Sequence, residues 1–121
     1  MSDDPRHTLG RRGEELAAEH LERLGYRVID RNYRTRFGEL DLVATGDFVL
    51  VFCEVKTRRD GGDPWQNLGE AKRRQVRSMG RAWLSEVHDR PRCSELRFDA
   101  IGIVMDASGR LKSLDHLEGA F

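Results

Sequence analysis

One apolar segment restricts the possible folds of this chain more than any other. Residues 48–53 are all apolar, and Glu54, Val55 and Lys56 follow directly. A strand that is apolar on both faces is typical of the centre of an α/β sheet, where other elements cover it above and below. The run is far shorter than the roughly 20 residues that cross a bilayer, so no membrane span is expected. The segment therefore predicts a central, buried strand.

Helical and strand patterns lie on both sides of this segment. Apolar residues recur at three- and four-residue steps in two stretches, which predicts helices over 10–24 and 68–87. Their order among the strands predicts a single α/β domain over 10–121, built on a central mixed sheet of about five strands flanked by helices. Residues 1–9 are expected to form a flexible tail. The predicted strands are 26–33, 40–44, 48–56, 96–105 and 111–117.

Composition narrows the class of protein. Lys plus Arg and Asp plus Glu each number 21 in the 121 residues, so the net charge is zero. This excludes a uniformly basic nucleic-acid coat but allows local basic patches. The start is acidic and shows no secretory signal, and the two cysteines lack C-x-x-C spacing, so free thiols in the cytoplasm are expected. The histidines also lack ligand spacing and are expected at the surface: His7, His20, His88 and His116.

Two acidic side chains are predicted to meet at one end of a strand hairpin. Asp41 lies among apolar residues, and counting back from the turn at 45–47 places it beside Glu54 on the next strand. Two carboxylates brought together repel each other unless a cation lies between them. Mg²⁺ binds carboxylate oxygens and keeps several of its waters. The pattern therefore predicts a Mg²⁺ or Mn²⁺ site with Asp41 and Glu54 as ligands.

Two further residues complete the candidate catalytic group. Lys56 is two positions from Glu54 and shares its face of the strand, where an ammonium group stabilises negative charge on a phosphate. Glu14 lies on the buried stripe of the first helix, which makes it a candidate outer ligand. Each has a simpler interpretation. An isolated Glu-x-Lys forms an ion pair at a strand end, and a Glu near a helix N-terminus interacts with the helix dipole.

Basic residues are concentrated in two segments. Residues 27–36 contain four arginines, and residues 72–81 contain five basic residues without an acid. Arginine binds phosphate through two parallel hydrogen bonds, and such clusters are typical of nucleic-acid binding, although a solvated face fits each cluster alone. Lys72 and Gln75 lie on the apolar stripe and are expected to turn toward the sheet. The predicted nucleic-acid contacts are Arg34, Arg36, Arg58, Lys72, Arg73, Arg74, Gln75 and Arg77.

The motifs together resemble one bacterial family, YraN. They are Gly13-Glu14, Gly25-Tyr26, Arg31-Asn32, Gly38-Glu39-Leu40-Asp41-Leu42-Val43, Phe52-Cys53-Glu54-Val55-Lys56, Arg97-Phe98-Asp99 and Ala120-Phe121. The resemblance implies a restriction-endonuclease-like fold with a PD-(D/E)-x-K site, similar in motif order to archaeal Holliday-junction resolvases. It implies that Asp41 and Glu54 bind the metal, Lys56 is the motif lysine and Glu14 the helix acid. No proline precedes Asp41, so the literal Pro-Asp is absent.

The sequence thus leads to one main hypothesis and two alternatives. The main hypothesis is a metal-dependent endonuclease that hydrolyses phosphodiesters in structured or branched nucleic acid, with DNA expected. The first alternative is a nucleic-acid-binding module that does not cut. The second is a protein-interaction subunit with a degenerate site. A second copy of the chain is a candidate partner, and no membrane partner is expected.

Overall fold

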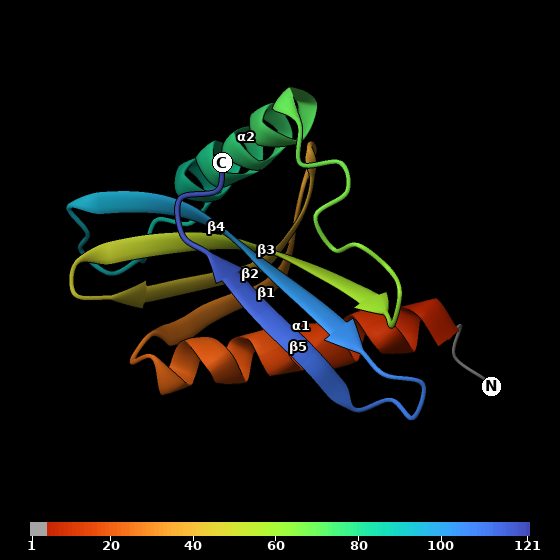
Figure 1. Ribbon diagram of the computed structural model, residues 1–121. Helices are drawn as coiled ribbons and strands as arrows, with labels where there is room; N and C mark the ends of the chain where they lie inside the picture. The colour runs from red at the N-terminus through yellow and green to blue at the C-terminus, as the bar shows by residue number, and fades with distance from the viewer. Residues whose placement is uncertain (1–4) are drawn as a thin grey trace.

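A five-stranded mixed sheet forms the centre of the structure, a computed structural model that describes residues 5–121 (Figure 1). The strands lie side by side in chain order. Only β3 and β4 pair in parallel, because α2 connects them; the other neighbours are antiparallel. The elements are α1 (Pro5–Arg23), β1 (Arg27–Thr35), β2 (Gly38–Gly46), β3 (Val49–Arg59), α2 (Glu70–Glu86), β4 (Glu95–Met105) and β5 (Leu111–Leu117).

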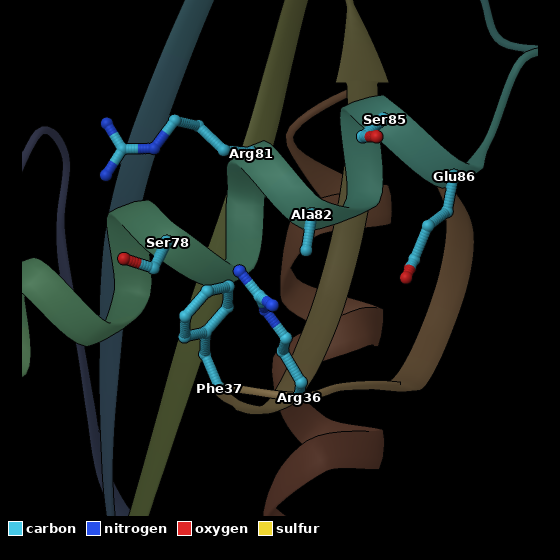
Figure 2. A pocket seen from close by; sticks show the side chains of 7 residues that line it. All are labelled: Arg36, Phe37, Ser78, Arg81, Ala82, Ser85 and Glu86. Atoms are coloured by element: carbon cyan, nitrogen blue, oxygen red, sulfur yellow. The ribbon is translucent and has the colours of Figure 1, made fainter.

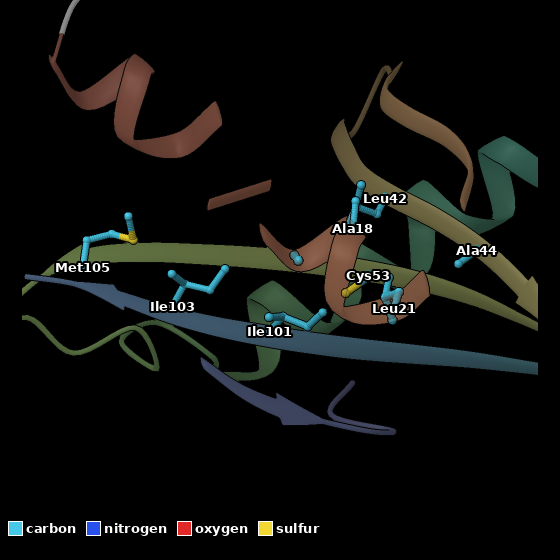
Figure 3. Packing of buried hydrophobic residues seen from close by; sticks show 9 residues of the cluster. Ala18, Leu21, Leu42, Ala44, Cys53, Ile101, Ile103 and Met105 are labelled. Atoms are coloured by element: carbon cyan, nitrogen blue, oxygen red, sulfur yellow. The ribbon is translucent and has the colours of Figure 1, made fainter. Parts of the chain in front are cut away.

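The two helices cover opposite faces of the sheet (Figure 1). Alternate side chains of each strand point to opposite faces, which divides the apolar residues into two clusters. On the α1 side, Leu21 packs against Leu42 and Ile101, as Figure 3 shows. On the α2 side, Trp83 and Phe52 pack edge to face, with ring centroids 5.6 Å apart. The predicted α/β class, with a mixed sheet flanked by helices, is confirmed and is consistent with a restriction-endonuclease-like fold.

Strand β3 is the covered central strand that the apolar segment predicts. Residues 49–54 are all buried, and β3 pairs with β2 on one edge and with β4 on the other. Burial of one Leu or Phe side chain contributes about 1.5–3 kcal/mol, so this strand carries much of the stability of the core. The buried stretch ends at Glu54, where the first charged side chain of the strand lies inside the protein.

Helix α1 begins earlier than the sequence pattern predicts. It starts at Pro5 rather than at residue 10, so half of the expected tail is helical. Proline is favoured at the first helical position because a backbone N–H at that position has no partner within the helix, so its absence in proline costs nothing. Leu9 packs against the cluster on the α1 side, which extends the buried stripe by one turn. The rest of the expected tail, residues 1–4, lies outside the described residues.

A glycine sets the depth at which α1 packs on the sheet. Gly13 faces Thr57 of β3, and a Cβ on residue 13 would overlap the Thr57 hydroxyl. The absence of a side chain allows the helix backbone to approach the strand closely. This contact brings the next residue, Glu14, to the end of β3. Within residues 5–121, the structure contains no helix with the length and hydropathy needed to span a membrane.

Candidate metal and nucleic-acid site

The candidate site lies where the β2–β3 ladder ends. The last pair in register is Leu42 with Cys53, and beyond it the two strands separate. Asp41 Oδ2 accepts a hydrogen bond of 2.7 Å from the Val55 backbone N–H. The carboxylate thus takes the place of a ladder partner, which satisfies a backbone donor and fixes the orientation of Asp41. Leu40 packs on the α2 side and Leu42 on the α1 side, so the side-chain alternation breaks at Asp41.

Glu54 is a buried carboxylate held between two lysines. Its exposure is only 5%, and its Oε1 lies 3.3 Å from Lys56 Nζ and 3.1 Å from Lys72 Nζ. Its other oxygen, Oε2, is buried and has no hydrogen-bond partner in the described part of the chain. A buried acceptor without a partner costs about 1–3 kcal/mol, and more when it is charged. One oxygen of this carboxylate therefore lacks compensation from the described residues.

The electrostatics of Asp41 indicate a site that is short of positive charge. Burial and the neighbouring Glu54 carboxylate raise the pKa of Asp41 from 3.8 to about 8, and Glu14 adds to this effect. The Val55 N–H and Lys56 lower the pKa of Asp41 but do not offset this increase. Two carboxylates in a poorly solvated place repel each other, so one of them retains its proton unless a cation is bound.

An open cavity of about 510 Å³ adjoins the end of β3. Glu14 lines it from α1, and Lys56 and Arg58 line it from β3. The four predicted catalytic residues lie near one another: Asp41 interacts electrostatically with Glu54, Glu14 and Lys56, and Lys56 forms an ion pair with Glu54. Of the four, Glu14 and Lys56 line the cavity. Arg58 also lies here, with its Nη1 donating 2.9 Å to the Thr57 carbonyl.

The donor set decides which cation fits. Among residues 5–121 no three His, Cys, Asp or Glu side chains are arranged as a ready metal cage. Zn²⁺ in proteins is held by three or four ligands, mostly Cys and His, whereas Asp41 and Glu54 are two carboxylates. Mg²⁺ is held by one or two carboxylates and completes its shell with waters and substrate phosphates. The available donors, Asp41 and Glu54, fit a hard cation of this kind.

The predicted nucleic-acid residues fall into separate groups. Lys72 turns inward as expected, and its Nζ also donates to Gln75 Oε1 at 3.3 Å. Gln75 Nε2 in turn donates 3.0 Å to the Phe37 carbonyl at the tip of the β1–β2 hairpin. Arg73 and Arg74 are exposed on the outer side of α2. Arg34 and Arg36 belong to the hairpin, where Arg34 lies 3.8 Å from Glu39.

Arg77 differs from its neighbours on α2. Its Nη2 donates 2.9 Å to the Phe121 carbonyl, and its guanidinium lies 5.6 Å from the centre of the Phe98 ring. Phe121 itself is buried in the cluster on the α2 side. Arg77 therefore attaches Phe121 to α2, a contact that Arg73 and Arg74 do not make.

The expectation that the histidines lie at the surface is wrong for His116, and His20 beside it is half-buried. His88 is exposed, and the side chain of His7 lies outside the described part of the structure. His116 lies 2.8 Å from Asp99 Oδ2 and 3.0 Å from His20 Nε2, and its side chain is 8% exposed. Arg97 donates two bonds of 2.9 Å to the same Asp99 carboxylate, which is fully buried. The Arg97-Phe98-Asp99 motif supplies two members of this cluster, but no local motif signals the histidines, because His20 and His116 are 96 positions apart in the chain.

Asp99 is ionised in this cluster despite its burial. Burial alone raises the pKa of Asp99, but the hydrogen bonds from His116, Arg97 and the Gly119 N–H outweigh it, and the net pKa is lowered. For His20, burial and the neighbouring His116 lower the pKa. The cluster joins α1, β4 and β5 on the sheet face opposite to α2, so its role is to hold these elements together.

The comparison with known proteins places the chain in a family. The model of the Uncharacterised protein family UPF0102 matches residues 13–103. A UPF0102 protein of Pelobacter propionicus is 44% identical, over 98% of this chain and 84% of the relative. A UPF0102 protein of Pelotomaculum thermopropionicum is 41% identical over 98% of both chains. One of Acidothermus cellulolyticus is 39% identical over 96% of this chain and 95% of the relative. The chain belongs to the UPF0102 family, which is the YraN family that its motifs resemble.

Proposed function

We propose that this protein is a metal-dependent endonuclease that hydrolyses phosphodiesters in structured nucleic acid, with DNA as the expected substrate. Asp41 and Glu54 hold one Mg²⁺ or Mn²⁺ ion. The observation that carries the proposal is Glu54 Oε2, which is buried and has no hydrogen-bond partner among residues that the structure describes, beside the raised pKa of Asp41. Together they describe two carboxylates that become stable as a charged pair once a divalent cation binds. The motif order shared with PD-(D/E)-x-K nucleases adds support.

The surrounding residues have distinct roles in this proposal. When bound, the ion supplies an activated water and offsets charge on the scissile phosphate. The Val55 N–H holds the Asp41 carboxylate in place. Lys56 and Lys72, which pair with Glu54 Oε1, would stabilise the negative charge that develops on the phosphate oxygens. Glu14 orients water at the cavity mouth. Both cysteines are free thiols, which fits the cytoplasmic location that we assign to this activity.

A cleavage screen tests the proposal. Purified protein is incubated with Mn²⁺ and with single-stranded, blunt duplex, flapped and branched DNA, and with RNA of the same forms. The matched variants are Glu54→Gln, which keeps the shape of the side chain but removes its charge, and Glu39→Gln. Glu39 is exposed on the same strand as Asp41 and forms an ion pair with Arg34, so its replacement serves as the control.

The outcomes separate the three hypotheses. The nuclease proposal expects Mn²⁺-dependent cleavage of at least one substrate by the wild type and by Glu39→Gln, and loss of cleavage in Glu54→Gln by a factor of about 10²–10⁴. Salt-sensitive binding without cleavage under any condition selects the binding module. An absence of both binding and cleavage selects the protein-interaction subunit.

A further inference from the structure

A second cavity lies between the tip of the β1–β2 hairpin and helix α2. Its volume is about 520 Å³, within the range of pockets that hold small organic groups. In Figure 2, Phe37 and Arg36 lie side by side on one side of α2, and Ala82 and Glu86 point from the helix to that side. Arg81 also lines the cavity but leaves the helix in another direction. Ser78 and Ser85 complete the lining.

The chemistry of this lining matches a nucleobase and its phosphate. Phe37 is 39% exposed, and the Arg36 guanidinium lies 4.7 Å from the centre of its ring. Aromatic rings and guanidinium planes both stack on unpaired bases, because every base presents a π-face. Glu86 accepts a 2.7 Å hydrogen bond from the Tyr33 hydroxyl, and its carboxylate also suits the amino group of a base. Arg36 and Arg81 supply positive charge for the phosphate backbone of the nucleic acid.

The cavity is fixed relative to the candidate metal site by side-chain contacts. Gln75 donates to the Phe37 carbonyl and accepts from Lys72, and Lys72 contacts Glu54. Gly38 allows this contact, since it has a φ of +138° and a Cβ there would lie 2.8 Å from Gln75 Nε2. From Lys72 to the part of the cavity lining at 78–82 is about 9–15 Å along α2, at roughly 1.5 Å per residue. That distance corresponds to about three or four stacked nucleotides.

We propose that this cavity is a stacking site for an unpaired nucleobase, placed a few nucleotides from the phosphate at the candidate metal site. The proposal rests on the proposed nuclease function and adds the class of substrate: a strand with an unpaired segment beside the cleaved bond. The base stacks on Phe37 and Arg36 and presents its edge to α2. Its phosphates lie toward Arg36 and Arg81.

Equilibrium binding in Ca²⁺, which suppresses cutting, tests this site. The probes are fluorescent duplexes of the same length, one blunt and one with a single-stranded overhang, each made in DNA and in RNA. The variants are Phe37→Ala, Phe37→Trp and Phe48→Ala. Phe48 is a matched control because it is 69% exposed and follows the turn at the opposite end of β2. Thermal unfolding of each variant verifies that it is folded.

The site predicts a selective effect. Phe37→Ala weakens binding of the overhang probe by about 5- to 150-fold, the measured range for one stacked base, and changes binding of the blunt probe less than about twofold. Phe37→Trp restores the affinity for the overhang probe. Phe48→Ala changes the affinity for neither the overhang probe nor the blunt probe. Different affinities for the DNA and RNA overhangs identify which nucleic acid the site takes. Equal losses for both probes, or a loss equally large in Phe48→Ala, would overturn the proposal.

The same variants in Mn²⁺ distinguish the two proposals. If the wild type cleaves DNA and Phe37→Ala has no effect on overhang binding, the stacking site is wrong and the nuclease proposal stands. If the overhang binds through Phe37 but is cleaved under no metal condition, the nuclease proposal is wrong and the stacking site stands. If the wild type binds none of the probes, both are wrong.

Discussion

Lys72 Nζ and Glu54 Oε1 lie 3.1 Å apart, although one residue belongs to a helix and the other to the central strand. The pair compensates a buried negative charge in the metal-free protein. It also places a cation beside the carboxylate to which the proposed metal binds. Under the metal-site proposal, Lys72 and the ion compete for the same carboxylate, and this competition has measurable consequences.

Replacement of Lys72 by Met is expected to lower the stability of the metal-free protein and to increase its response to metal. The decrease is about 1–3 kcal/mol, because Lys56 then remains as the cation beside Glu54. Mn²⁺ then stabilises the variant more than it stabilises the wild type, since the Lys72 ammonium group no longer competes. Urea unfolding with and without Mn²⁺ measures both effects. Lys112→Met removes an exposed ion pair with Asp60 and serves as the control; an equal Mn²⁺ response in all three proteins would contradict the competition.

Asp41→Asn is expected to stabilise the metal-free protein in a pH-dependent manner. The folded pKa of Asp41, about 8, lies above its ordinary value of 3.8, so the folded state binds the proton more tightly than the unfolded state. Wild-type stability therefore falls as the pH rises from about 4 to about 8, and the asparagine variant does not show this fall. The difference at about pH 8 is on the order of 2 kcal/mol or more. Urea unfolding across this pH range measures the difference in stability. Two parallel pH profiles would mean that the pKa of Asp41 is not raised in the folded protein.

Asp99→Asn is expected to destabilise the protein strongly at neutral pH. The variant leaves Arg97 and His116 without their buried anion, which costs about 3–5 kcal/mol. The lowered pKa of Asp99 contributes stability above its unfolded value of 3.8, and that contribution is lost as the pH falls through the folded pKa. The difference between wild type and variant thus shrinks below about pH 4. Unfolding curves at neutral and acidic pH test this, with the exposed Asp115→Asn as a control that behaves like the wild type.

The exposed arginines of α2 are expected to set the salt dependence of nucleic-acid binding. The double variant Arg73→Ala/Arg74→Ala reduces the logarithmic salt slope by about 0.9 for each duplex phosphate that is no longer neutralised, without a change in sequence preference. Arg23→Ala/Arg92→Ala removes two exposed arginines elsewhere on the chain and leaves the slope unchanged. Arg77→Ala mainly lowers stability, because its hydrogen bond to Phe121 is removed. The measurement is nucleic-acid affinity as a function of ionic strength in Ca²⁺. Identical salt slopes for the two double variants would mean that this face of α2 is only solvated.

Local patterns predicted the elements and the centre of the candidate site. The apolar run before Glu54 identified β3, and counting back from a short turn placed Asp41 near Glu54 because a hairpin fixes its own register. The helical stripe likewise predicted that Lys72 turns inward. The first turn of α1 is not predicted because Leu9 alone, without a second apolar contact among the described residues 8–10, gives too weak a periodic signal.

Contacts between distant parts of the chain were not accessible to the same reasoning. Asp99 and His116 are 17 positions apart and lie on neighbouring strands whose register no motif specifies. The contact of Gln75 with the Phe37 carbonyl spans 38 positions and depends on how the hairpin packs on α2. Side-chain periodicity reports which face a residue occupies, but not which residue of another element lies opposite to it.

Direct measurement of Mn²⁺ binding tests the central claim that Asp41 and Glu54 form a metal site. The electron paramagnetic resonance signal of free Mn²⁺ disappears on binding, so a titration reports both the number of sites and their affinity. The account predicts one saturable site in the wild type and in Glu39→Gln, and its loss in Asp41→Asn and in Glu54→Gln. Binding of Mn²⁺ by Glu54→Gln with wild-type affinity, or no saturable binding by the wild type, would contradict it.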